Sequence, residues 1–236
     1  MGLRAKEHIP NRSLGLSIVS KMDHEREHFM LPKDRKAHWD MVYERNAFHD
    51  VSWYREHLDT SLRMIEATGA ALDAPILDVG GGLSTLADDL LQQGYSNLTV
   101  LDLANAALIA ARCRLGASSA RVTWLTGDVL SAPFEKGRLA VWHDRAVFHF
   151  LTHTEERASY VRQVLHALQP DGHVVLATFG PEGPTRCSGL DTCRYDAASL
   201  SATFGPDFVL SDSTIEIHNT PAGKEQQFLY CRLQRR

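Results

Sequence analysis

Apolar and polar positions follow two different periods along this chain, and the two periods alternate from residue 76 onward. Short runs of aliphatic and β-branched residues predict strands over 76–79, 98–103, 122–129, 174–179 and, where a strand runs into a turn, 139–151. Apolar residues spaced three and four positions apart predict helices over 84–93, 104–115, 154–168 and 195–204. This alternation is typical of an α/β domain built on a doubly wound parallel sheet.

The ends of the chain depart from this pattern. Residues 208–217 and 226–233 alternate like two antiparallel strands joined by a turn, and they predict a C-terminal hairpin. Residues 1–32 have no sustained apolar period, so we predict an N-terminal extension followed by one domain over 33–236. Two helices are expected between residue 34 and Gly69, before the first strand.

Aromatic residues are frequent in this helical region. Trp39, Tyr43, Trp53 and Tyr54 have two interpretations. They either pack the helices on the sheet, or form a lid in which flat rings contact a flat or cationic ligand. The pattern leaves both open.

The first strand ends in an acid, Asp78, followed after one residue by Gly80, Gly81 and Gly82. Glycines can adopt positive φ and leave backbone N–H groups uncovered, so a ligand can approach the backbone closely. Ser84 then opens a helix, whose N-terminus favours electron-rich groups. These features predict a cradle for a nucleotide-type ligand.

Two further acids follow strands. Asp102 lies twenty residues after Gly82, about where a Rossmann-type sheet places an acid on the ribose hydroxyls. The alternative for Asp102 is an N-cap of the next helix. The Asp128 carboxylate can accept a hydrogen bond from the exocyclic amine of adenine, and the N–H of Val129 can serve a ring nitrogen. Because the carboxyl ends of parallel strands line one crevice, these groups are expected to converge.

The fourth strand leads into the residues that we predict to face the reacting partner. Asp144 would orient an incoming group or accept a hydrogen bond from it. Arg145 would bind an anionic part of the reacting partner, and His149 would take a proton. The alternatives are a buried structural pair of Asp144 with Arg145 and a packed core histidine. His143, His149 and His153 match no zinc motif, so we predict no metal site.

A long loop over 180–190 and the residues after it have the composition of a specificity loop. Arg186 and Arg194 are candidates for gripping an anionic substrate. Cys187 and Cys193 are candidates for reactive thiols, although buried unreactive cysteines are the more common case.

Composition limits the class of partner. The 236 residues carry a formal net charge of −4, and Lys and Arg are scattered, which argues against a nucleic-acid binder. The four cysteines form no zinc-like pair, and the N-terminal region has no long apolar core. We expect a cytoplasmic protein with reduced thiols and no membrane partner, present as a monomer or weak dimer.

With these segments in place, residues from about 36 to 234 resemble the class I S-adenosylmethionine (AdoMet) methyltransferases. The resemblance is carried by D-x-G-x-G-x-S from Asp78, by Asp102 and Asp128, and by the terminal hairpin. The stretches 142–151 and 186–190 look like a group of small methyltransferase-domain proteins. The resemblance implies a Rossmann-like seven-stranded sheet of order 3-2-1-4-5-7-6.

The resemblance also implies an enzyme that uses AdoMet to methylate N, O or S of a small molecule or a protein side chain. The residues predicted to bind the cofactor are Trp39, Tyr43, Trp53, Asp78, Gly80, Gly81, Gly82, Ser84, Asp102, Leu103, Asp128, Val129 and His143. Three alternatives stay open: an AdoMet-binding module without catalysis, a protein-lysine methyltransferase and an NAD-dependent oxidoreductase. His143-Asp144-Arg145 departs from the Asp-Lys-Gly of the lysine enzymes, and Thr85 breaks the NAD fingerprint.

Overall fold

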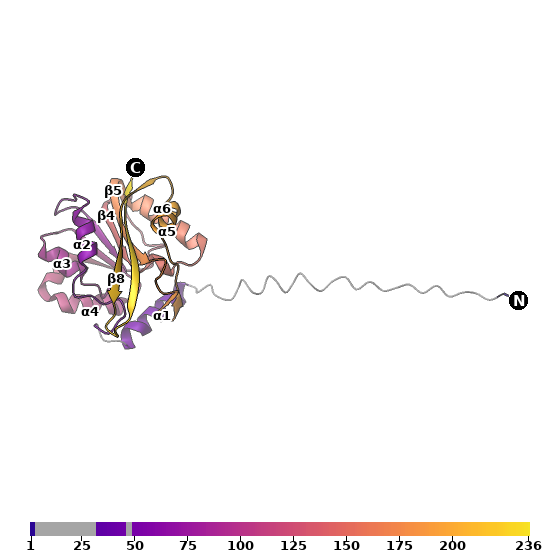
Figure 1. The fold of residues 1–236 in the computed structure, drawn as a ribbon. Helices are drawn as coiled ribbons and strands as arrows, with labels where there is room; N and C mark the ends of the chain where they lie inside the picture. The colour runs from indigo at the N-terminus through magenta and orange to yellow at the C-terminus, as the bar shows by residue number, and fades with distance from the viewer. Residues whose placement is uncertain (3–31, 46–48) are drawn as a thin grey trace.

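The computed structural model describes residues 1–2, 32–45 and 49–236 of the chain. Its centre is a seven-stranded sheet in the order β3 (Val122–Thr126), β2 (Leu98–Asp102), β1 (Ile76–Val79), β4 (Leu139–Arg145), β5 (Leu168–Phe179), β9 (Glu225–Arg235) and β8 (Phe208–Asn219) (Figure 1). The first five strands are parallel, and β9 and β8 form an antiparallel hairpin. Apart from two short strands outside this sheet, the order is the predicted 3-2-1-4-5-7-6, so the predicted fold is confirmed.

Helices cover both faces of the sheet. One side carries α2 (Asp59–Glu66), α3 (Leu86–Gln92) and α4 (Asn105–Leu115), and the other carries α5 (Thr154–Ala167) and α6 (Ala197–Phe204) (Figure 1). Two 3₁₀ turns, η2 (Gly116–Arg121) and η3 (Phe148–Phe150), follow α4 and β4. The first helix, α1 (Pro32–Arg45), contacts α4 at one end of the sheet. The predicted extension falls almost wholly on residues 3–31, outside the described part, so the domain division stays a prediction.

The core is split between the two faces because successive strand residues point to opposite sides. Val141 belongs to the buried cluster that contains Leu90 of α3, whereas Trp142 belongs to the cluster that contains Val164 of α5. The buried Trp142 Nε1–H donates to the Tyr160 hydroxyl at 2.8 Å. Each central strand therefore anchors helices on both sides and holds the strand ends in place.

The fifth strand is longer than predicted. It begins at Leu168 rather than residue 174, because the turn residues 169–172 form an irregularity inside the strand. Asp171 adopts a φ of 60°, and a Cβ on Gly172 would lie 3.1 Å from the Ala140 carbonyl oxygen. The pairing with β4 is present on both sides of this turn, at Leu168 and from His173 onward.

The predicted loop over 180–190 contains a small hairpin of β6 (Arg186–Cys187) and β7 (Leu190–Asp191). Ser188 and Gly189 connect these strands with φ values of 50° and 81°, which is a backbone suited to a tight hairpin. The loop is therefore more ordered than its composition predicts.

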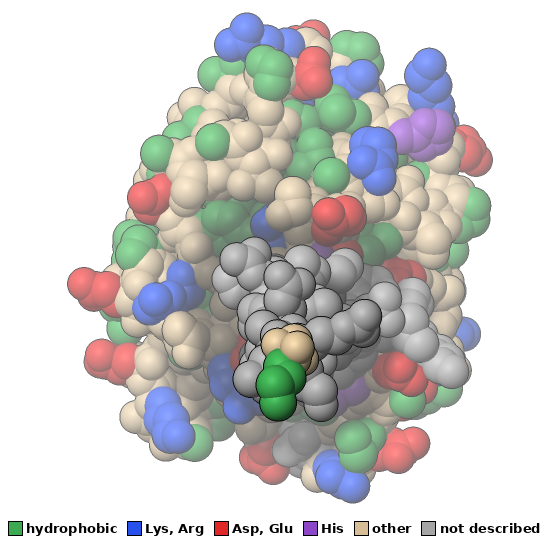
Figure 2. Space-filling view, turned by 90° about the vertical axis from the view of Figure 1, so that its right-hand side faces the viewer, with side chains coloured by type: hydrophobic (Ala, Val, Ile, Leu, Met, Phe, Trp, Pro, Cys, Tyr) green, Lys and Arg blue, Asp and Glu red, His purple; other side chains and the backbone are tan. Residues whose placement is uncertain are grey.

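The surface carries both signs of charge. Acidic and basic side chains are interspersed over the described residues on the face drawn in Figure 2, and neither sign forms a continuous field there. Within the described part of the chain, no helix combines the length and apolar character needed to cross a membrane.

Candidate active site

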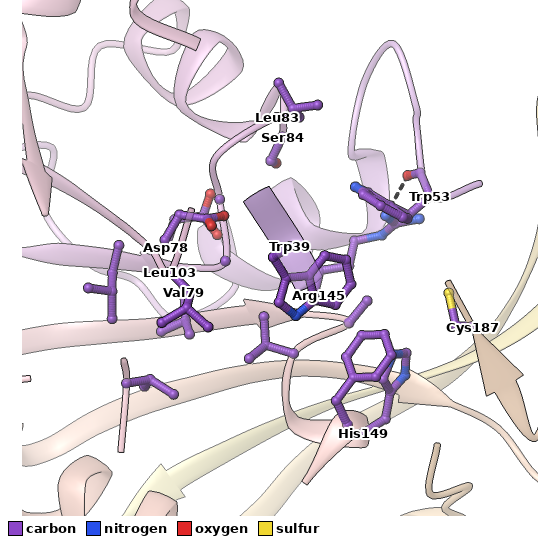
Figure 3. A pocket seen from close by; sticks show the side chains of 18 of the residues that line it. Trp39, Trp53, Asp78, Val79, Leu83, Ser84, Leu103, Arg145, His149 and Cys187 are labelled. Carbon is purple, nitrogen blue, oxygen red and sulfur yellow. Dashed lines mark hydrogen bonds between the residues drawn. The ribbon is translucent and has the colours of Figure 1, made fainter. Parts of the chain in front are cut away.

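The carboxyl ends of the parallel strands border one pocket, and α1 and Trp53 line it from the other side (Figure 3). The volume of the pocket is about 1200 Å³ when the open space at its mouth is included. The predicted residues that line it are Trp39, Tyr43, Trp53, Asp78, Gly80, Gly81, Ser84, Asp102, Leu103, Asp128, Val129, Arg145 and His149. Three predicted residues, Gly82, His143 and Asp144, are not among the lining residues.

The glycine turn after β1 leaves no space for side chains. Gly80 adopts a φ of 68°, and a Cβ there would lie 2.2 Å from a Val147 methyl carbon. A Cβ on Gly81 would lie 2.1 Å from Asp78 Oδ2. The backbone can therefore follow the pocket wall only because these positions lack side chains.

Gly82 has a different role from the predicted one. A Cβ there would lie 2.5 Å from the Ala107 Cβ of α4, so this glycine permits close packing of helix against turn. Its N–H donates to Asp102 Oδ2 at 3.1 Å. We therefore correct the prediction that Gly82 contacts the cofactor: its N–H supports the Asp102 carboxylate instead.

Asp78 combines burial with an unsatisfied acceptor. One carboxylate oxygen accepts from His143 Nδ1 at 2.7 Å, whereas Oδ2 lies buried without a hydrogen-bond partner. A buried carboxylate oxygen without a donor costs about 1–3 kcal/mol or more, so a ligand donor at this point would be stabilising. Asp78 is thus the clearest open acceptor of the pocket.

His143 lies behind Asp78 and not in the pocket. Its Nδ1 faces Asp78 and its Nε2 faces the Ser61 hydroxyl of α2 at 2.9 Å, so both ring nitrogens are engaged. Since an ionised carboxylate only accepts, Nδ1 carries the proton and Ser61 donates to Nε2. We correct His143 from a cofactor contact to a residue that positions Asp78, and Ser61 is a supporting residue that no sequence pattern indicated.

Asp102 is held by two backbone donors. Its oxygens accept from the N–H of Gly82 at 3.1 Å and of Ala104 at 2.8 Å. Burial raises the pKa of Asp102 to about 6, despite these two bonds. The N-cap residue of α4 is Ala104 and makes no side-chain cap bond, so the N-cap interpretation of Asp102 is wrong.

Asp128 and Val129 lie at the far end of the same wall. Asp128 Oδ1 accepts from the N–H of Leu130 at 2.9 Å, and its Oδ2 lies 3.6 Å from Arg35 Nη2 of α1. Arg35 also pairs with Glu156 of α5 at 2.9 Å. This arginine, which no sequence pattern indicated, connects α1 to the segment after β3 and to α5.

The aromatic residues of the N-terminal region both pack together and line the pocket. The Trp39 ring centroid lies 5.9 Å from that of Trp53, 6.0 Å from that of Tyr43 and 5.1 Å from that of Phe150. They cover a small apolar cluster that includes Leu83. The two interpretations of these rings are therefore compatible, because the packed rings are themselves one wall of the pocket.

Asp144 points away from the pocket. Its carboxylate accepts from the Tyr160 hydroxyl at 2.6 Å and from the N–H groups of Val147 and Phe148 at 2.9 and 3.1 Å. It is fully buried, and burial raises its pKa to about 6. We correct its predicted contact with the reacting partner: Asp144 shapes the turn after β4, where Ala146 has a φ of 74°.

Arg145 is directed by three groups and keeps one free nitrogen. Nε donates to the Tyr230 hydroxyl at 2.9 Å, Nη1 donates to the Trp53 carbonyl at 2.8 Å, and Cζ lies 4.8 Å from the Phe228 ring centroid. Nη2 is buried without a partner. The expected alternative, a structural pair with Asp144, is not formed.

His149 is a hydrogen-bond donor rather than a base. Its Nδ1 accepts from the N–H of Phe179 at 3.2 Å, which places the ring proton on Nε2, and Nε2 has no partner. Burial, followed by the nearby Arg145, lowers the pKa of His149 to about 3. We therefore correct the prediction that His149 takes a proton: it is a neutral imidazole whose Nε2–H is available as a donor.

The loop residues divide into lining and remote ones. Cys187 lines the pocket, and burial raises the pKa of its thiol. Arg186 is exposed and pairs with Asp191 at 3.1 Å, and Arg194 donates to the Gly183 carbonyl at 3.5 Å; neither lines the pocket. Over residues 32–45 and 49–236, His, Cys, Asp and Glu side chains form no group of three or more that could hold a metal.

Comparison with known proteins agrees with this architecture. Residues 76–172 match the family described as "Methyltransferase domain". This segment is therefore similar to a methyltransferase domain, and the fold is like that of Rossmann-like methyltransferases. The matched segment includes β1, the glycine turn, Asp102, Asp128 and the turn after β4.

The curated proteins to which the chain is similar are methyltransferases named for different acceptors. The chain is 23% identical to EEF1A lysine methyltransferase 2 of Danio rerio over 189 residues, 74% of this chain and 75% of the relative. It is 27% identical to the ubiquinone biosynthesis O-methyltransferase of Serratia proteamaculans over 173 residues, 73% of this chain and 63% of that enzyme.

Solved structures share the fold at lower identity. A methyltransferase from Anabaena variabilis aligns with a TM-score of 0.67 at 16% identity over 89% of this chain and 96% of its own. The 1,6-didemethyltoxoflavin-N1-methyltransferase of Burkholderia thailandensis, with bound 1,6-didemethyltoxoflavin and S-adenosylhomocysteine, aligns with a TM-score of 0.64 at 19% identity, over 88% and 92%.

Several lining residues of the pocket were missed from the sequence. They come from segments far apart in the chain and are Arg35, Phe150, Gln226 and Phe228. Phe228 begins an apolar run of β9 that is buried over residues 228–231, and this run predicts burial but not a place in the pocket. The others depend on how α1 and the hairpin pack against the strand ends.

Proposed function

We propose that this chain transfers a methyl group from AdoMet to a small-molecule acceptor. The observation that carries the proposal is the single pocket: it joins the open Asp78 Oδ2 and the polar strand ends to an aromatic region around Arg145 and His149. One end has groups for a nucleoside and an amino acid, and the other has room for an acceptor.

The residues at the strand ends fit AdoMet by their chemistry. Asp78 Oδ2 would accept from the cationic amino group of the methionyl part, and the Asp102 carboxylate would accept from the ribose hydroxyls. Asp128 and the N–H of Val129 would serve the edge of adenine. The cradle left by Gly80 and Gly81, which a Cβ would fill, lets the ligand contact the backbone.

AdoMet supplies a methyl group on a sulfonium: transfer breaks the S–CH₃ bond, leaves its electron pair on sulfur and forms a bond from an acceptor lone pair to the methyl carbon. The chain's own groups would align the acceptor and exclude water. The packed rings of Trp39, Trp53 and Phe150 close one side of the pocket. His149 already accepts a backbone N–H at Nδ1, so it would hold an acceptor by donation from Nε2.

A protein-lysine acceptor is the second candidate, because the chain is similar to an EEF1A lysine methyltransferase. Arg145 argues against it, since this cation lines the pocket and would repel the ammonium group of a lysine side chain bound near it. Labelled AdoMet and fractionated lysate distinguish the two. Label that follows small molecules supports our proposal, whereas label that follows protein favours the lysine enzyme.

AdoMet binding tests the first step. We expect calorimetry to give a micromolar Kd, roughly −8 kcal/mol. Absence of binding at millimolar AdoMet would reject the proposal. Binding without methyl transfer to any lysate component would favour the alternative of a non-catalytic AdoMet-binding module. A cytoplasmic location and a monomeric or weakly dimeric state belong to this proposal and rest on the sequence alone.

A further inference from the structure

The aromatic end of the pocket holds buried polar atoms without partners. Two are donors, Arg145 Nη2 and His149 Nε2–H, and one is an acceptor, Gln226 Oε1. Buried polar atoms are nearly always paired in folded proteins, so three of them in one pocket indicate a ligand that satisfies them. Both donor residues lie near the Phe228 ring, with Arg145 Cζ 4.8 Å and the His149 ring 6.5 Å from its centroid.

Charge is distributed unequally along the pocket. The lining carboxylates, Asp78, Asp102 and Asp128, belong to β1, β2 and the segment after β3, on one side of β4. Arg145 and His149 lie on the other side, toward β5 and β9, and Figure 3 shows His149 well apart from Asp78. The other two lining arginines are paired with carboxylates, Arg35 with Glu156 and Arg55 with Glu216.

Among the described residues, no carboxylate lies within ion-pair distance of Arg145. A buried guanidinium without a counter-ion is costly, and a bound anion would compensate it. The shape of the site is set by Phe150, Phe179 and Phe228, whose ring faces and edges favour a flat molecule.

We propose that this end of the pocket is a subsite for a flat, weakly acidic acceptor that binds as its oxyanion, such as a phenolate or enolate. Arg145 Nη2 and His149 Nε2–H donate to the oxygen, and the phenylalanine rings hold the plane of the molecule. This inference rests on the proposed function and names its substrate class.

The chemistry balances without a base in the pocket. The acceptor loses its proton to solvent before it binds, so its lone pair is available for methyl transfer. The new O–CH₃ bond uses that lone pair, and the electron pair of the broken S–CH₃ bond remains on sulfur. The positive sulfonium and the negative oxyanion thus both become neutral. A neutral His149 that only donates a hydrogen bond to the oxyanion is consistent with this order of steps.

The test uses 4-nitrophenol, whose anion absorbs visible light and whose neutral form does not. It is titrated with the full chain loaded with S-adenosylhomocysteine, at a pH near the pKa of the free phenol. We expect added protein to increase the phenolate fraction. The cation 4-nitrobenzylammonium, which resembles a lysine side chain, should not displace the phenolate.

Arg145→Gln should weaken 4-nitrophenolate binding roughly tenfold and abolish the rise in absorbance. The matched control is Arg186→Gln, since Arg186 is exposed and does not line the pocket; it should behave as the natural chain. Retained binding of S-adenosylhomocysteine shows that each variant is folded. If Arg145→Gln does not fold, the inference is tested on the natural chain alone, by comparing 4-nitrophenolate with 4-nitrobenzylammonium.

Two results overturn the inference: no increase in phenolate on the natural chain, or displacement of 4-nitrophenolate by 4-nitrobenzylammonium. Failure of the chain to bind S-adenosylhomocysteine is a different outcome, since it rejects the proposed function itself. The two failures are therefore distinguishable in the same titration series.

Discussion

At the scale of single residues, side-chain direction decides which predicted groups reach the pocket. Asp78 and His143 are register partners on adjacent strands, and their side chains meet on the face toward α2. Asp144 comes one residue later and therefore points to the opposite face, where Tyr160 binds it. A sequence shows the acids at strand ends but not which face each side chain occupies, so both Asp102 and Asp144 were expected in the pocket, and of the two the pocket is lined by Asp102.

The open oxygen of Asp78 gives a first prediction. Asp78→Asn should weaken AdoMet binding about tenfold to a hundredfold, because a charge-assisted hydrogen bond to the cationic amino group is replaced by an amide. Calorimetry measures the Kd. Asp73→Asn, at an exposed aspartate, is the control and should leave the Kd unchanged. An equal Kd for Asp78→Asn would remove this residue from the cofactor site.

A second prediction concerns Asp144 and pH. Burial raises its pKa from 3.8 to about 6, so between these values the folded chain retains a proton that the unfolded chain releases. The free energy of unfolding therefore falls as pH rises through this window. Asp144→Asn removes that titration. Over the same pH range, the free energy of unfolding of the variant should therefore fall by roughly 2 kcal/mol less than that of the natural chain.

Urea unfolding at several pH values measures this difference. The informative quantity is the slope against pH and not the absolute stability, because the amide also changes the bonds to Tyr160 and the turn. Asp102 titrates in the same window and contributes equally to both chains. Parallel slopes for the natural chain and the variant would contradict the prediction.

At the scale of elements, the strands and helices of the sheet were predictable and their attachments were not. Apolar periodicity located β1, β2, α4 and α5 to within a few residues, because each must bury one face or stripe. The hairpin β6–β7 and the early start of β5 depend on local backbone geometry at Ser188 and Asp171, which periodicity does not report. The position of α1 depends on the ion pairs of Arg35.

Those ion pairs give a third prediction. Arg35→Ala should loosen α1 from the pocket, raise hydrogen exchange across residues 34–45 and weaken AdoMet binding roughly threefold to tenfold. Lys36→Ala is the matched control, because Lys36 pairs only with Asp40 inside the same helix. Unchanged exchange in Arg35→Ala would show that aromatic packing alone holds α1.

At the scale of the whole molecule, the strand ends meet at one edge of a doubly wound sheet. That rule brings together groups spread from Asp78 to Phe179, and from the sequence it predicted that Asp78, Asp102 and Asp128 lie in one crevice, which they line. The acceptor end combines β4, η3 and the C-terminal hairpin, so it depends on long-range packing and was only partly foreseen.

Ligand-dependent stability gives a fourth prediction. AdoMet at a hundred times its Kd should stabilise the chain by about 2.7 kcal/mol, which is a rise in Tm of roughly 5–10 °C for a chain of this size. S-adenosylhomocysteine should act similarly. NAD should have no effect, and a larger shift with NAD than with AdoMet would favour the oxidoreductase alternative.

The backbone bond from Phe179 to His149 has a consequence for turnover. Because the imidazole keeps its single proton on Nε2 throughout the neutral range, His149 contributes no titrating base to the transfer. The pH at which activity rises would then differ from one substrate to the next, following the acidity of each hydroxyl. Among competing compounds of similar shape, the more acidic one would be methylated at lower pH.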